Sequence, residues 1–181
     1  LTAVLPIFHN MLQLNNGVRK IHGRSEPFFS EIGEMAGLAE TDWSWSVLIA
    51  DFDNDGFKDV HITNGLGRDA TNTDFLEYAR NTVAATGIPE SDLGQRRKFM
   101  ERLSSIGPLS LRNYLFRNNG GLAFQDVSES AGITETGVSN VAVYVDLDND
   151  ADLDVVTNNI NGPAFIRRND SDPKNYLTIR L

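Results

Sequence analysis

The chain has 181 residues, a formal net charge of −9 at pH 7 and no cysteine. This length is enough to bury a sizeable core, in one domain or in a large part of one. The absence of cysteine excludes disulfide scaffolds, zinc–thiolate sites and thiol catalysis. No apolar run approaches membrane-spanning length, so we expect a protein that is not membrane-spanning. The chain opens Leu1-Thr2 without Met and shows no signal peptide, which indicates a processed form or a piece of something longer.

Residues 1–65 have the patterns of a first β region. Apolar side chains recur at every second position in residues 43–50, with Trp43, Trp45, Val47 and Ile49 on one face. This alternation predicts a strand whose apolar face is buried. Residues 59–63 predict a second strand, closed by an Asn-Gly pair.

An acidic loop, Asp-Phe-Asp-Asn-Asp-Gly-Phe-Lys-Asp, connects these two strands. Its carboxylates at positions 1, 3, 5 and 9 belong to Asp51, Asp53, Asp55 and Asp59. In a tight turn they would point at one centre and repel each other. A hard divalent cation with oxygen ligands removes this repulsion, and calcium is the best candidate. We expect the backbone carbonyl of Phe57, at position 7, to join the ligand set.

Residues 66–110 have no counterpart elsewhere in the chain and predict a helical insertion. Apolar side chains recur at four-residue steps in residues 72–85. A second helical pattern starts near Ser91 and stops at a Gly-Pro pair, residues 107–108. We therefore expect a helical hairpin inserted between two β units.

The acidic loop returns at residues 146–154, and residues 29–64 align with residues 124–159 at a constant offset of 95. The expected ligands of this second copy are Asp146, Asp148, Asp150, Asp154 and the backbone carbonyl of Asp152. Ala151 replaces the Gly at position 6, which should cost roughly 1 kcal/mol if a left-handed backbone is kept. We therefore predict a weaker second site that is still filled at millimolar calcium.

Residues 111–170 predict a second β region, with a hairpin over residues 113–124 around an Asn-Asn-Gly-Gly turn. A third hairpin start appears at residues 165–170, and residues 171–181 predict the start of a further strand or module. Two hairpins per repeat make four short strands, and such repeats are typical of solenoids, propellers and arrays. We predict a mainly β fold, with about two four-stranded antiparallel propeller-type blades, calcium-binding hairpin loops and an inserted helical hairpin.

An EF-hand does not fit the loops. Position 12 is Ile62 in one copy and Thr157 in the other, where an EF-hand needs Glu, and the flanks predict strands. The loops hold nine of the 25 acidic residues, and two bound divalent cations would bring the net charge from −9 to about −5. The acidity therefore names no partner and disfavours nucleic acid.

A predicted strand is followed by the loop pattern Asp-x-Asp-x-Asp-Gly-x-x-Asp and by a second predicted strand. This order resembles the FG-GAP/VCBS repeat family, the calcium-binding β-propeller repeats of integrin α-subunits and of many secreted or surface bacterial proteins. Residues 113–120 (Asn-Tyr-Leu-Phe-Arg-Asn-Asn-Gly), with residues 124–127 and 131–133, look like bacterial VCBS proteins that end in an ASPIC/UnbV module. Residues 175–181 look like the first strand of that module. The resemblance implies calcium at both loops and a propeller of about seven blades, of which this chain would hold about two.

Three functions fit these patterns. The favoured one is a non-enzymatic, calcium-stabilised protein for adhesion or ligand binding, with a protein or glycan ligand. It would be extracellular, on the cell surface or periplasmic, because weak calcium sites fill only at millimolar calcium. The second is a structural protomer that self-associates through blade edges. The third is a propeller scaffold of a polysaccharide-processing enzyme, which needs a buried polar constellation that the sequence does not offer; His9, His22 and His61 are isolated.

Overall fold

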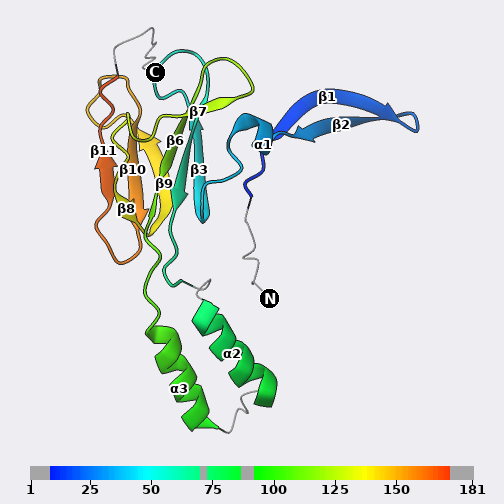
Figure 1. Ribbon diagram of the computed structural model, residues 1–181. Helices are drawn as coiled ribbons and strands as arrows, with labels where there is room; N and C mark the ends of the chain where they lie inside the picture. Colours follow the sequence, from blue (N-terminus) through cyan, green and yellow to red (C-terminus); the bar gives the residue numbers. More distant parts are fainter. Residues whose placement is uncertain (1–8, 70–72, 87–91, 172–181) are drawn as a thin grey trace, which may run out of the picture.

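A computed structural model of the chain describes residues 9–69, 73–86 and 92–171. Strands make up 40% and helices 17% of it, so the predicted mainly β class is confirmed. All strand pairs are antiparallel, and none of the sheets formed by these residues closes on itself. Figure 1 shows two neighbouring sheets, from which a long hairpin and a pair of helices project.

The larger sheet has four strands in the order β3-β4-β6-β7. They are β3 (Ser44–Ala50), β4 (Asp59–Asn64), β6 (Tyr114–Asn118) and β7 (Phe124–Asp126). The strands predicted over residues 43–50 and 59–63 and the hairpin predicted over residues 113–124 are confirmed. Because β4 pairs with β6, strands from both predicted β regions form one sheet.

The two predicted helices are α2 (Thr73–Thr86) and α3 (Leu93–Ser104). Asp92 caps α3, since its Oδ1 accepts the N–H of Gln95 at 2.9 Å. The expected place of the helices between two blades is wrong, because they lie in the chain between β4 and β6, which are neighbours in one sheet. The pair projects from the end of that sheet (Figure 1). No helix in the described ranges is long and apolar enough to cross a membrane.

The second sheet has three strands in the order β11-β10-β9. They are β9 (Ser139–Val145), β10 (Asp154–Asn159) and β11 (Phe165–Arg167), and they correspond in order to β3, β4 and β6. A short pair, β5 (Leu111–Arg112) with β8 (Thr136–Gly137), accompanies the sheets. One sheet of four strands and one of three are thus present. The further strand predicted over residues 171–181 lies almost wholly outside the described residues.

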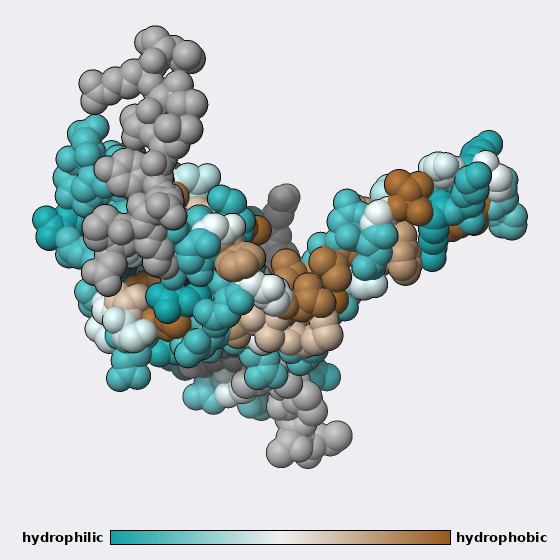
Figure 2. Space-filling view, turned by 90° about the horizontal axis from the view of Figure 1, so that it is seen from above, coloured by the Kyte–Doolittle hydropathy of each residue, from teal (hydrophilic) through white to brown (hydrophobic). Residues whose placement is uncertain are grey.

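A separate hairpin precedes the sheets. It consists of β1 (Gln13–Ile21) and β2 (Arg24–Glu31) and is followed by the one-turn helix α1 (Gly33–Ala36). The hairpin projects away from the rest of the molecule (Figure 1), and Figure 2 shows hydrophobic side chains along it and at its base. Of this N-terminal part, Leu12 and the segment after β2 pack on the larger sheet.

That segment covers part of one face of the larger sheet. The core cluster consists of Ala36, Leu38, Val60, Ile62 and Phe116. β3 lies at the sheet edge beyond this cover, so Trp45, Val47 and Ile49 are 52%, 58% and 53% exposed. The expectation that this alternating face is buried is wrong for that reason.

A buried polar network joins the two sheets. The Oδ1 of Asn113 accepts the N–H of Asn64 at 2.9 Å, and its Nδ2 donates to the Oγ of Ser139 at 3.0 Å. The hydroxyl of Ser139 donates to the Oδ1 of Asn159 at 2.8 Å. All four residues are buried. Since a buried polar group without a partner costs free energy, the network fixes how the sheets meet.

Replacing Asn113 by Ala should lower the free energy of unfolding by about 1–3 kcal/mol, because the buried N–H of Asn64 loses its acceptor. The matched control Asn119→Ala, at an exposed position, should change it by less than about 0.5 kcal/mol. Urea unfolding of both variants measures the two effects. An unchanged unfolding midpoint for Asn113→Ala would show that the network does not stabilise the fold.

Candidate metal centre

Both acidic loops are the tips of β-hairpins, as the sequence predicts. In the first, Ala50 pairs with Asp59 across β3 and β4. In the second, Val145 pairs with Asp154 across β9 and β10. The strands therefore bring the first and ninth positions of each loop close together, which is what a nine-residue metal loop requires.

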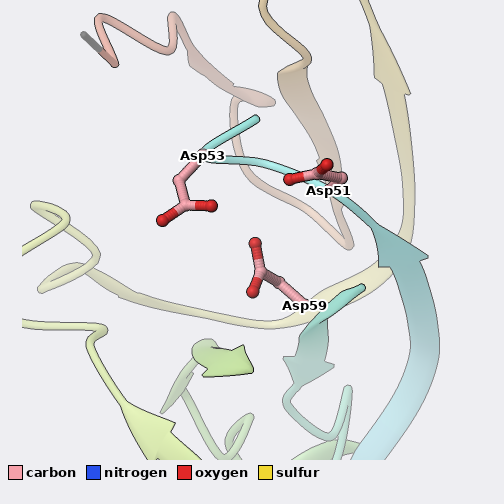
Figure 3. A group of neighbouring side chains, drawn as sticks. All are labelled: Asp51, Asp53 and Asp59. Carbon is pink, nitrogen blue, oxygen red and sulfur yellow. The ribbon is translucent and has the colours of Figure 1, made fainter. Parts of the chain in front are cut away.

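Three carboxylates converge at each tip. One oxygen from each of Asp51, Asp53 and Asp59 lies within 4.8 Å of the others. Figure 3 shows the three groups facing a common space. The corresponding group at the second tip consists of Asp146, Asp148 and Asp154. These are positions 1, 3 and 9 of the predicted ligand set, and oxygens at this spacing can bind one hard cation.

The carboxylates at the fifth position stand outside these triads. The Oδ1 of Asp55 accepts the N–H of Phe57 at 2.8 Å, and the Oδ1 of Asp150 accepts the N–H of Asp152 at 3.0 Å. In this geometry they shape the turn. Their role as ligands, and that of the backbone carbonyls of Phe57 and Asp152, stays a prediction.

The first-position carboxylate also organises its loop. Both oxygens of Asp51 accept backbone N–H groups, from Asp55 at 3.0 Å and from Gly56 at 2.8 Å. Asp146 accepts two in the same way, from Asn149 at 2.7 Å and from Ala151 at 3.2 Å. Each carboxylate oxygen has further lone-pair capacity. The same groups can therefore hold the backbone and face a cation.

The ninth-position carboxylate ties each tip to a further strand. Asp59 is buried and accepts the N–H of Phe52 at 3.0 Å with one oxygen and that of Asn118 at 2.9 Å with the other. Asp154 is also buried and repeats this pattern with the N–H groups of Leu147 and Asn169, both at 2.8 Å. Each ninth-position carboxylate thus connects three chain segments.

The loop pattern in the sequence does not predict that Asn118 and Asn169 hold the ninth-position carboxylates. Besides its backbone N–H, the Nδ2 of Asn118 donates to the carbonyl of Lys58 at 3.2 Å. The Nδ2 of Asn169 donates to the carbonyl of Leu153 at 3.4 Å. The signal was present, because the repeated hairpin starts end on these two asparagines. Nothing local indicated that they would hold a loop far away in the sequence.

Burial, with crowded charge adding to it, raises the pKa of carboxyl groups at both tips. Burial raises the pKa of Asp59, and the charges of Asp53 and Asp55 add to this, although two backbone N–H groups oppose it. Burial also raises the pKa of Asp152, with the charge of Asp150 adding. A bound divalent cation would reverse these effects and stabilise the ionised forms.

The two tips contact each other. The Nδ2 of Asn54, in the first loop, donates to the Oδ1 of Asp152, in the second, at 2.6 Å. The Nδ2 of Asn169, whose N–H holds Asp154, also donates to the carbonyl of Phe52 at 2.6 Å. An ion at one tip would therefore act on groups that touch the other.

A cavity of about 400 Å³ lies between the sheets beside the first loop. His61, Arg117 and Arg167 are among the residues that line it. His61 is fully buried, and neither ring nitrogen makes a hydrogen bond of normal geometry to the described residues. Burial, with the nearby Arg167, lowers the pKa of His61 to about 4, so the imidazole is neutral at pH 7. No local pattern in the sequence indicates that His61 shares a cavity with two arginines.

No family model matches the chain, and no curated protein matches its sequence. The resemblance to FG-GAP/VCBS repeats therefore stays a prediction. The interpretation of the loops depends on their geometry, which is the same in two copies: a hairpin tip, three convergent carboxylates and a buried ninth position.

Substitutions at the sixth loop position measure the free-energy cost of a left-handed backbone at a residue other than Gly. Gly56 and Ala151 have φ of 96° and 75°, and a Cβ at Gly56 would meet no atom within 4 Å. Gly56→Ala should lower the free energy of unfolding by about 1 kcal/mol. Ala151→Gly should raise it by less than about 1 kcal/mol, because Gly also adds entropy to the unfolded chain.

Urea unfolding of both variants in EDTA measures these shifts without a contribution from metal. Opposite signs for the two substitutions are the expected result. Destabilisation by Ala151→Gly as large as that by Gly56→Ala would contradict the backbone explanation.

Proposed function

We propose that this chain binds two calcium ions, one at each acidic hairpin tip, and that the ions stabilise a non-enzymatic binding scaffold. The observation that carries the proposal is the repeated triad: Asp51, Asp53 and Asp59 converge in one loop, and their counterparts converge in the other. Two copies with the same geometry make a chance cluster of exposed carboxylates a poor explanation.

The donor set favours calcium over other common metals. All the convergent side chains are carboxylates, which suit hard cations, whereas zinc and copper sites normally use His or Cys. Magnesium demands near-ideal octahedral geometry and keeps several waters. Calcium accepts six to eight oxygens in flexible arrangements, so carboxylates, loop carbonyls and water can complete its shell.

The proposed role of the ions is structural. The carboxylates that would bind them also hold the backbone of each loop and, through Asn118 and Asn169, a neighbouring segment. Neutralising their charge would strengthen the hairpin tips and the contact between them. Metal binding of this kind adds to folding stability, because the unfolded chain has no assembled site.

The scaffold would serve adhesion or ligand binding in a secreted or cell-surface protein of the FG-GAP/VCBS type, with a protein or glycan as ligand. Support for this comes from the resemblance of the repeats and from the millimolar calcium outside cells, which fills weak sites. The projecting helical pair offers a surface for such a ligand (Figure 1).

Calcium calorimetry on single-site variants tests the proposal. The wild-type chain should bind two ions, and Asp51→Ala and Asp146→Ala should each bind one, because each removes a convergent ligand. The remaining site in Asp51→Ala should be the weaker, since the strain at Ala151 opposes the ordering of that loop. Asp74→Asn, which removes a charge at an exposed position of α2, is the control and should bind two.

Two outcomes would count against the proposal. Unchanged stoichiometry in both Asp→Ala variants would show that the ions bind elsewhere. Tighter binding at residues 146–154 than at residues 51–59 would contradict the predicted order of the two sites.

A further inference from the structure

The projecting hairpin β1–β2 repeats the hairpin β6–β7 in register. Asn15 pairs with Phe29 in the first hairpin, and Asn118 pairs with Phe124 in the second. The phenylalanines are counterparts in the 95-residue repeat. The two hairpins differ mainly in length, because the tip of β1–β2 is longer.

The hydrogen bonds at the open ends of the two hairpins also agree. The N–H of Ile32 donates to the carbonyl of Leu12 at 2.9 Å, and the N–H of Val127 donates to the carbonyl of Leu115 at 2.9 Å. The backbone groups of Leu12 and Leu115 therefore point toward the second strand of their own hairpin. Because backbone groups in a strand alternate in direction, Gln13 and Asn15 direct theirs to the opposite edge of β1.

The same asparagine turn occurs three times. The Oδ1 of Asn15 accepts the N–H of Gly17 at 2.8 Å, and that of Asn118 accepts the N–H of Gly120 at 2.9 Å. The third copy is the bond from the Ser171 N–H to the Asn169 Oδ1, at 3.2 Å. Asn15, Asn118 and Asn169 are thus equivalent positions in three hairpin starts.

Two of these three asparagines hold an acidic loop. The backbone N–H of Asn118 donates to Asp59, and that of Asn169 donates to Asp154. β6, which ends at Asn118, pairs with β4, and β11, which precedes Asn169, pairs with β10. By contrast, the outer edge of β1 pairs with no strand among residues 9–69, 73–86 and 92–171.

The hairpin β1–β2 also leaves apolar side chains exposed. A two-stranded hairpin is at best marginally stable alone in water, and Met11 and Val18 are 71% and 69% exposed. An unpaired edge with exposed apolar side chains can bind an added strand. The two internal counterparts indicate which kind of strand fits.

We propose that the outer edge of β1 binds a third β-hairpin of the same type as residues 43–64. The ninth-position carboxylate of its acidic loop would accept the backbone N–H of Asn15. Both hairpins of this type among residues 9–69, 73–86 and 92–171 are already paired, with β6 and β11, so the occupant is a further hairpin with the same acidic loop. The inference follows from strand pairing and does not require that the loops bind metal.

The internal pair sets the expected register. Val60 faces Phe116 and Ile62 faces Tyr114 across β4 and β6. By equivalence, the residues at positions 10 and 12 of the added loop and strand would face Gln13 and Met11. The ladder would extend the two-stranded hairpin to four strands, the number in the larger sheet.

A fusion that supplies the missing hairpin tests the proposal. A copy of residues 43–64 is joined ahead of Leu1, with residues 1–8 as the linker, and amide hydrogen exchange is followed by NMR. Exchange at the Gln13 and Asn15 amides should slow by about tenfold or more, because both N–H groups gain acceptors. The amides of Phe116 and Asn118, already paired, serve as internal references.

The matched control is the same fusion with Val60→Lys and Ile62→Lys in the added copy only, which should leave exchange at Gln13 and Asn15 as in the unfused chain. Equal exchange in the two fusions would overturn the proposal, as would protection of these amides in the unfused chain. The measurement is made in EDTA and repeated in calcium. Slower exchange should occur in both conditions, whereas a third calcium ion should bind only when calcium is present. Failure of strand pairing and failure of metal binding are therefore distinguished.

Discussion

The buried carboxylate at the ninth position of each acidic loop is the interaction on which both sheets depend. Asp59 receives one N–H from its own loop and one from Asn118, and Asp154 receives the equivalent pair. Hydrogen bonds to an ionised carboxylate are roughly twice as strong as neutral ones. One side chain thereby closes a hairpin tip and fixes the neighbouring strand. Its cost is a buried negative charge beside other carboxylates, and a cation would offset that cost.

The same contacts couple the two loops. Asn54 reaches from the first loop to Asp152 in the second, and Asn169 holds Asp154 while it donates to Phe52. The tips therefore behave as one polar assembly at one end of the paired sheets. The buried network around Asn113 and Ser139 joins the sheets at a second place. Between the two lie a cavity and a neutral, fully buried His61.

The sequence reveals features that are local in the chain and hides those set by distant pairing. The spacing of the Asp residues predicts a hairpin tip with convergent carboxylates, because the turn itself brings positions 1, 3 and 9 together. The helices are likewise readable from their periodicity. That they interrupt a single sheet could not be predicted, because nothing local shows that β4 and β6 pair across residues 66–110. Alternation around Trp45 predicts an apolar face, but only the packing of the segment after β2 decides that the face stays exposed.

Anomalous diffraction from crystals grown in calcium tests the central claim most directly. Two calcium peaks are expected, one among Asp51, Asp53 and Asp59 and one at the equivalent place in the second loop. Ligand oxygens should lie at about 2.3–2.6 Å from each ion. Peaks only at other places, or no peak at either tip in millimolar calcium, would contradict the assignment of the loops as metal sites.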